Sequence, residues 1–162
     1  MTYRLPASLT PAPSDAYTVT GIKSLDTSDG YAYTGTLRAG KRIIGNVENS
    51  GTGGPTTVYL KDPAKDRAPW LEWAAKWPEA RGPQDDEWAA AELAEEALLV
   101  KSLRNASRRG IPVLLDADLS SPIHGFSIAT GFRSDTPGHL ESLREDERLS
   151  AYWDGTAWVP MR

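Results

Sequence analysis

The clearest element in this sequence is a long helix, expected at residues 85–109. Its first turn is acidic and its last turns are basic, which is the distribution that the helix dipole favours. Gly82-Pro83 interrupts the chain before the segment, and Gly110 follows it in the position of a C-terminal cap. The basic residues therefore have a structural explanation and do not by themselves indicate a nucleic-acid site: Lys101, Arg104, Arg108 and Arg109.

On either side of this helix the sequence predicts mainly strands. Apolar and polar residues alternate at 17–22 and 31–38, which is the pattern of half-buried antiparallel strands, and 41–48 and 56–61 are expected as the strands that follow. A short helix is expected at 69–77. Later segments predict a buried strand at 111–115, a strand at 126–132, a short helix at 136–149 and a hairpin at 150–159 around Asp154-Gly155. The predicted fold class is α+β: an N-terminal antiparallel β-meander, a central short helix plus long helix, then C-terminal strands, a short helix and a β-hairpin.

Length and composition limit the classes of function. A chain of 162 residues has the size of one domain, so we expect a single domain at 1–162, with 1–16 as an extended N-terminal arm. The chain has no cysteine, which excludes disulfides and a thiol nucleophile. A net charge of −4 without a basic face argues against a nucleic-acid polymer as partner. No apolar run reaches the ~20 residues of a membrane helix, so we expect a cytoplasmic protein with no membrane partner. We also expect no bound metal and no cofactor.

The first candidate site is the glycine-rich loop at 46–55. Glycines allow positive φ, so successive backbone amides can point at one anion. The predicted ligand-binding residues are Asn46, Asn49, Gly51, Thr52, Gly53 and Gly54, with Arg42 and Lys61, together with Lys41, adding positive charge from the adjoining strands. The segment is neither a Walker motif nor a dinucleotide fingerprint, because no Lys-Ser/Thr follows the glycines and the next element is a strand. The alternative is a wide hairpin loop that uses glycine and asparagine for its geometry.

Two helical faces are also candidates. Trp70, Trp73 and Trp77 share one arc of the short helix, and Trp73 would stack on the ring of a nucleotide-like ligand. The alternative is that these rings are the core of a domain poor in phenylalanine. Glu92 and Glu96 fall inside the apolar arc of the long helix; buried together they would form a general acid or a metal-ligand pair, and otherwise they lie on a solvated edge.

A catalytic alternative rests on the residues after the buried strand. Asp116 and Asp118 stand where carboxylates often hold Mg²⁺, and His124 follows as a candidate base. This trio predicts a metal-dependent hydrolase. The opposing interpretation is that these residues form turns and helix caps.

Residues 35–59 resemble a segment of small uncharacterised proteins from phages and mobile elements. The resemblance is carried by the run Gly-Lys-Arg-Ile-Ile-Gly-Asn-Val-Glu-Asn-Ser-Gly-Thr-Gly-Gly between two strands. It implies no known activity; it implies an accessory protein that acts by binding, against host defence. Together the patterns favour a non-enzymatic binding protein that captures a small anionic, nucleotide-like ligand or a protein partner, with the metal-dependent hydrolase as the alternative.

Overall fold

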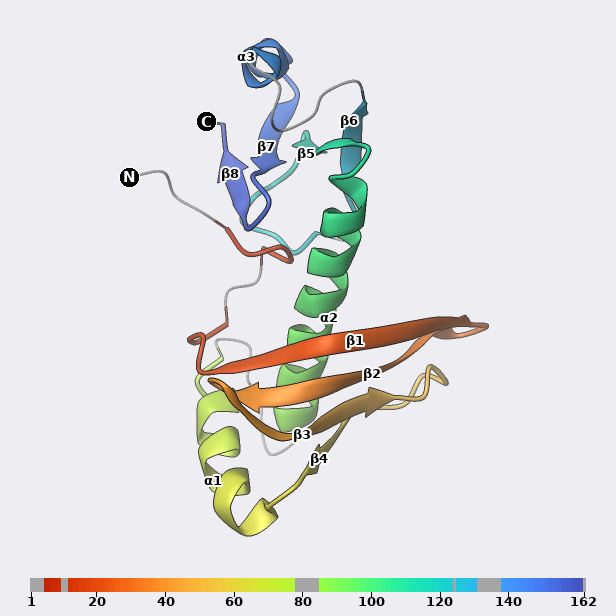
Figure 1. Ribbon diagram of the computed structural model, residues 1–162, viewed down its shortest axis with the longest axis vertical. Helices are drawn as coiled ribbons and strands as arrows, with labels where there is room; N and C mark the ends of the chain where they lie inside the picture. Colours follow the sequence, from red (N-terminus) through yellow and green to blue (C-terminus); the bar gives the residue numbers. More distant parts are fainter. Residues whose placement is uncertain (1–4, 10–11, 78–84, 124, 131–137, 162) are drawn as a thin grey trace. The chain divides into compact units, whose positions relative to one another are not determined.

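A computed structural model describes residues 5–9, 12–77, 85–123, 125–130 and 138–161 (Figure 1). The chain divides into two compact units. One, the meander unit, comprises Ala12–Ala97. The other, the terminal unit, comprises Met1–Pro11 with Leu98–Arg162, so the two ends of the chain belong to the same unit. Each unit contains its own antiparallel sheet, and the α+β prediction is confirmed.

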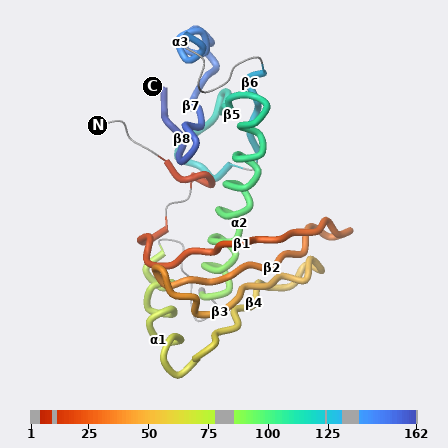
Figure 2. Tube along the Cα trace, in the orientation of Figure 1, coloured from red at the N-terminus to blue at the C-terminus, as the bar shows by residue number. Residues whose placement is uncertain are grey.

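The meander unit is built on four consecutive strands in the order β1-β2-β3-β4 (Figure 2). The strands are β1 (Tyr17–Thr27), β2 (Gly30–Ala39), β3 (Arg42–Asn49) and β4 (Thr57–Leu60). All neighbours pair antiparallel, as short turns between alternating segments predict. Gly40, at a φ of 57°, makes the tight turn between β2 and β3.

The two faces of this sheet differ. Buried residues on one face include Tyr17, Val19, Tyr33, Leu37 and Val47. Between β2 and β3 the register shifts, so that Leu37 pairs with Gly45 but Arg38 pairs with Ile43. Ile44 is the extra residue of this bulge and is buried, while its neighbour Ile43 stays exposed. The bulge therefore puts Ile43 on the opposite, solvent-facing side of the sheet.

Helix α1 (Pro63–Ala74) begins earlier than the expected 69–77. The Asp62 side chain caps it by accepting a hydrogen bond from the Lys65 amide at 3.2 Å, and Pro63 takes the first helical position, where no amide is needed. Pro69 lies inside the helix, so its interpretation as the first residue was wrong. Trp77 falls in the turn after the helix, its amide bonded to the Ala74 carbonyl.

Aromatic side chains pack the buried face of the meander unit. The ring of Tyr17 lies 5.1 Å from Trp70 and 5.0 Å from Trp73, centroid to centroid. The ring of Trp77 lies 5.2 Å from that of Trp88 in the following helix, which extends the series. Trp70, Trp73 and Trp77 are all buried, so these rings supply apolar area that phenylalanine supplies in most cores.

Helix α2 (Asp85–Ala106) confirms the long helix, although it ends before the predicted residue 109. Residues 107–109 form a turn, in which the Arg109 amide bonds the Ala106 carbonyl. Gly110 is not a cap: it starts β5 and pairs with Thr130. A Cβ at Gly110 would stand 2.3 Å from the Ala129 carbonyl oxygen, so glycine is needed there for close strand contact.

The terminal unit holds a second sheet in the order β6-β5-β7-β8. Its strands are β5 (Gly110–Leu115), β6 (Ser127–Thr130), β7 (Leu149–Trp153) and β8 (Trp158–Pro160), with α3 (His139–Arg144) between β6 and β7. β5 is buried along nearly its whole length, as its continuous apolar run predicts. The predicted hairpin is confirmed, since the Asp154 carboxylate accepts the amides of Thr156 and Ala157 at 2.8 and 2.9 Å and Gly155 has a φ of 102°. Residues 131–137 of the predicted strand and helix lie outside the described part.

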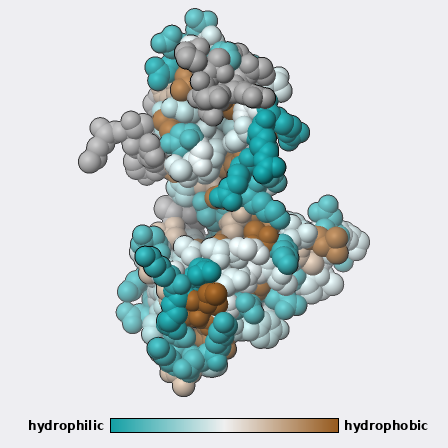
Figure 3. Space-filling model, viewed as in Figure 1, coloured by the Kyte–Doolittle hydropathy of each residue, from teal (hydrophilic) through white to brown (hydrophobic). Residues whose placement is uncertain are grey.

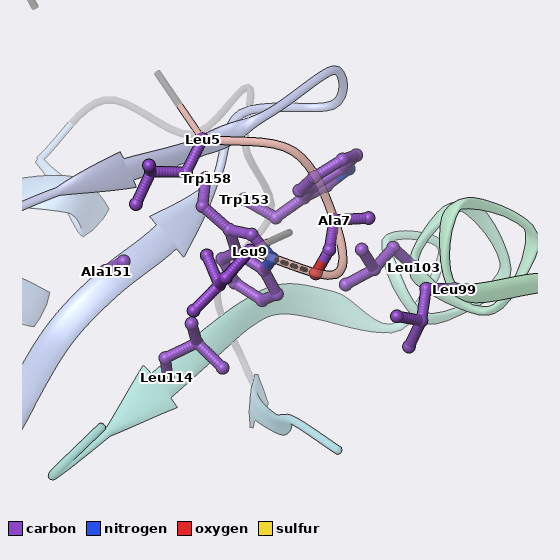
Figure 4. Packing of buried hydrophobic residues seen from close by; sticks show 9 residues of the cluster. All are labelled: Leu5, Ala7, Leu9, Leu99, Leu103, Leu114, Ala151, Trp153 and Trp158. Atoms are coloured by element: carbon purple, nitrogen blue, oxygen red, sulfur yellow. Dashed lines mark hydrogen bonds between the residues drawn. The ribbon is translucent and has the colours of Figure 1, made fainter. Parts of the chain in front are cut away.

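The N-terminal arm is part of the core of the terminal unit (Figure 4). Leu5 exchanges backbone hydrogen bonds with Trp158 at 3.0 and 2.9 Å, and the Trp158 indole donates to the Ala7 carbonyl at 2.9 Å. The arm contributes to one apolar cluster, which consists of Leu5, Ala7, Leu9, Leu99, Leu103, Leu114, Ala151, Trp153 and Trp158. Sequence reasoning left these arm residues without a structural role.

Within the described residues, no helix has both the length and the apolar character that crossing a membrane requires.

Candidate binding surface

The glycine loop between β3 and β4 is held by its own contacts. Gly51 is buried at a φ of 72°; its amide donates to the Asn49 carboxamide oxygen at 2.8 Å, and its carbonyl accepts from the Thr27 hydroxyl at 2.6 Å. The Asn49 amide group bonds the Gly54 carbonyl at 3.1 Å and the Thr56 hydroxyl at 3.2 Å. The Thr56 hydroxyl in turn meets the Tyr33 hydroxyl at 2.5 Å. Gly51 and Asn49 therefore stabilise the loop, because the groups named above already have hydrogen-bond partners.

Part of the predicted anion site keeps solvent-facing amides. Thr52, Gly53 and Gly54 are exposed, and their amides donate to no other group in the described part of the chain. Gly53 has a φ of 79°, and a Cβ there would meet nothing within 4 Å. Of the residues predicted to form the amide cradle, these three therefore have backbone amides that can still bind an anion.

The basic residues predicted for this loop lie at the other end of the sheet. Arg42 begins β3 whereas Asn49 ends it, and a strand of this length spans roughly 20 Å. Lys61 also lies at the Arg42 end, because its amide bonds the Ile44 carbonyl at 2.8 Å. The register thus separates Arg42, Lys61 and the turn residue Lys41 from the loop amides.

Arg42 has a structural partner at that end. Its guanidinium forms two hydrogen bonds to the buried Asp66 carboxylate, at 3.0 and 2.6 Å. These bonds lower the pKa of Asp66, so the carboxylate stays ionised beside the Tyr17 ring. The charge of Arg42 is therefore largely used in joining β3 to α1.

Trp73 lies at the same end and faces the core. Its side chain is 6% exposed, and its indole N–H donates to the Ser14 hydroxyl at 3.0 Å. Its ring neighbour Tyr17 pairs with Ala39, which in turn pairs with Arg42. The structure does not bring Trp73 to the glycine loop.

The sheet register instead assembles a different surface on the open face. Asn46 pairs with Thr36 on one side and with Tyr59 on the other, and Ile43 pairs with Arg38. Ile43 is 39% exposed and Tyr59 is 55% exposed. We define the Ile43 surface as these two side chains with the neighbouring cations: Arg38, Lys41, Ile43, Tyr59 and Lys61. In the space-filling view, brown apolar atoms over β3 are bordered by teal polar atoms (Figure 3).

Arg38 is held in place on this surface. Its Nε donates to the Thr20 hydroxyl at 3.0 Å, and its Nη1 donates to the Lys41 carbonyl at 3.1 Å. Neither partner is an acid, so the guanidinium keeps its charge for a ligand. Alternation along β2 is the sequence signal for one part of this surface, but it does not show which side chains of β3 and β4 lie beside Arg38.

The residues of the catalytic alternative are only partly described. Asp118 forms a turn: its Oδ1 accepts from the Ser120 amide and hydroxyl at 2.9 and 2.6 Å, and its Oδ2 accepts from the Ser121 hydroxyl at 3.1 Å. These bonds, chiefly from Ser120, lower the pKa of Asp118. Asp116 is exposed at a φ of 50°, and its amide bonds the Arg148 carbonyl. His124 lies outside the described residues.

The described residues contain no cluster of three or more acidic, histidine or cysteine side chains arranged to hold a metal ion. Glu92 and Glu96 are half-buried on α2. Because His124 is not among the described residues, the hydrolase alternative stays a prediction.

No protein-family model, curated protein or solved structure matches this chain. The resemblance of residues 35–59 to phage and mobile-element proteins therefore stays a prediction.

Proposed function

We propose that this chain is a non-enzymatic binding protein that recognises an acidic segment of a protein partner through the Ile43 surface. The observation that carries the proposal is the exposure of Ile43 and Tyr59 beside cations on the open sheet face. A large aromatic flanked by arginine is the composition that concentrates binding energy in protein interfaces.

Charge supports an acidic partner. The described strands place Lys23 and Arg38 on the open face with one acid, Glu48, which pairs with Thr34 and Thr57. The adjoining turns add Lys41 and Lys61, with Asp62 next to Lys61. The chain as a whole has a net charge of −4. Positive charge is thus concentrated locally on an acidic protein, which would steer an acidic segment to this face.

The extent of the surface favours a protein segment over a small ligand. Its side chains come from three neighbouring strands, which lie roughly 4.8 Å apart, so its members spread across the sheet. The bonds of Arg38 to Thr20 and Lys41 also reduce the ordering cost of binding. A small anion remains the alternative ligand, and its support is limited to the amides of Thr52, Gly53 and Gly54.

The proposal is tested by selecting binders from a random-peptide library against the immobilised full-length protein. We expect the selected peptides to be rich in Asp and Glu with at least one apolar residue. Lys41→Gln with Lys61→Gln should weaken their affinity by about 10-fold at low salt, and less at high salt where the charges are screened. The matched control is Arg108→Gln with Arg109→Gln, which removes the same charge from exposed residues of the terminal unit.

Two results would count against the proposal. One is a selection that yields peptides without acidic enrichment. The other is an equal loss of affinity in both double variants, which would show that only net charge matters.

A further inference from the structure

Strand β1 forms one edge of the meander sheet (Figure 1). Within the described part of the chain it pairs with β2 alone. Thr27 pairs with Gly30 across a turn of two residues, which makes this a hydrogen-bonded pair. Because such pairs alternate along an antiparallel ladder, the backbone of Leu25 also bonds β2, whereas the backbone groups of Ser24 and Asp26 point away from the sheet. This end of β1 can therefore accept another strand.

The side chains along this edge are also available for contact. Leu25 is 72% exposed, more than any other large apolar side chain among the described residues. The Ser24 hydroxyl and the Asp26 carboxylate are exposed, and neither forms a hydrogen bond or an ion pair in that part of the chain. Exposed edges are usually covered or carry charge, because unpaired backbone groups beside apolar side chains promote pairing with another chain. At Leu25 the edge has neither protection.

We propose that this edge pairs with the same edge of a second copy of the chain, antiparallel and about a two-fold axis at Leu25. The two Leu25 side chains then face each other on the open side of the sheet. Each Ser24 lies opposite Asp26 of the second copy, and each of these two pairs exchanges backbone hydrogen bonds. The Ser24 hydroxyl also donates to the Asp26 carboxylate across the interface, so both polar side chains gain a partner.

The residues of β1 favour this register over its neighbours. A two-fold axis at Lys23 or at Asp26 would set like charges directly opposite each other. An axis at Ser24 would set the Asp26 carboxylate opposite the buried Ile22. The bulge at Gly21, which has a φ of 60°, interrupts the edge beyond that point. The paired segment is therefore short and closes as a dimer.

The interface is small, because it consists of two backbone-bonded pairs and one leucine pair. We expect a dissociation constant on the order of 100 µM, so the dilute protein is monomeric. The pairing is independent of the proposed function, because it uses no residue of the Ile43 surface. Residues opposite each other share a face of the sheet, so the dimer displays both Ile43 surfaces on one side. If the proposed function holds, a partner with two acidic segments would gain avidity.

Single-cysteine crosslinking tests the register directly, because the chain has no cysteine of its own. Two residues facing each other in a non-hydrogen-bonded pair have Cα atoms about 4.5 Å apart, which permits a disulfide. Leu25→Cys should therefore oxidise to a covalent dimer at least about 10-fold faster than Thr18→Cys. Thr18 is the matched control because it is exposed on the same strand and face, yet its two copies would lie roughly 40 Å apart.

Sedimentation equilibrium of the full chain measures the association itself. The average mass should rise from 17.6 kDa towards twice that value between about 10 µM and 1 mM. Leu25→Lys sets two ammonium groups opposite each other and should weaken association by at least about 10-fold. Because Leu25 is exposed, the dilute variant should melt with the wild-type protein. Thr18→Lys adds the same charge outside the paired segment and should associate as wild type.

Four results would overturn the proposal. The first is a mass that stays at 17.6 kDa up to about 1 mM, and the second is a mass that grows beyond the dimer. The third is equal crosslinking of Leu25→Cys and Thr18→Cys. The fourth is a Leu25→Lys variant that associates as strongly as the wild type or as Thr18→Lys. None of these measurements uses an acidic peptide, so they do not bear on the Ile43 surface.

Discussion

Gly51 offers a quantitative test of the loop that joins β3 and β4. We expect Gly51→Ala to destabilise the meander unit far more than Gly53→Ala, although both glycines have positive φ, at 72° and 79°. The left-handed conformation costs an alanine about 1–2 kcal/mol, and this cost is common to both variants. At Gly51, however, the new Cβ would lie 2.6 Å from the Ala32 nitrogen and 2.9 Å from the Tyr31 carbonyl carbon, whereas at Gly53 it meets nothing within 4 Å.

The overlap at Gly51 involves backbone atoms of β2, which move only if the hairpin contacts also move. Forcing such a shift adds about 1–3 kcal/mol, so the total for Gly51→Ala is about 2–5 kcal/mol. Urea denaturation of the two variants measures the difference in unfolding free energy. If the two variants differ by less than about 0.5 kcal/mol, the account of Gly51 as a close-packed structural residue is wrong.

Two further predictions concern stability. Asp66→Asn should remove a pH-dependent contribution to the free energy of unfolding. Because Arg42 lowers the folded pKa of Asp66, this stabilisation is complete above the unfolded pKa of about 3.9. It is lost as the pH falls through the lower folded value. The melting temperatures of the wild-type protein and the Asp66→Asn variant should therefore converge below about pH 4, and a difference that stays constant with pH would contradict this. Leu5→Ala should cost about 2–4 kcal/mol in urea denaturation, because Leu5 is buried against Trp158, whereas Leu25→Ala, at a side chain that is 72% exposed, should change stability by less than about 0.5 kcal/mol. Equal effects of the two leucine variants would show that the arm is not part of the core.

The sequence predicted correctly those elements in which the residues at the ends and the hydrophobic period indicate the same structure. The long helix has acids at its start and a sustained apolar arc, and the Asp154-Gly155 hairpin has a turn that only a few residue types form. The start of α1 was missed because two proline positions competed for it. The Asp62 carboxylate decides in favour of Pro63, since it reaches the Lys65 amide.

Long-range contacts account for what sequence reasoning missed. Leu5, Ala7 and Leu9 alternate, but prolines interrupt the pattern, and their burial depends on Trp158 at the far end of the chain. For the candidate site, the sequence-based prediction grouped residues that are near one another along the chain. Antiparallel pairing places Lys41, Arg42 and Lys61 at the opposite end of the sheet from Thr52, Gly53 and Gly54. Only the register, including the bulge at Ile44, reveals which side chains share the open face.

The central claim is that an acidic segment binds the Ile43 surface. Amide chemical-shift mapping of the full-length protein, titrated with the strongest peptide from the selection, tests it most directly. We expect the largest perturbations at Arg38, Ile43, Tyr59 and Lys61, with loss of these perturbations when Ile43 is changed to serine. Perturbations confined to Thr52, Gly53 and Gly54 would contradict the claim.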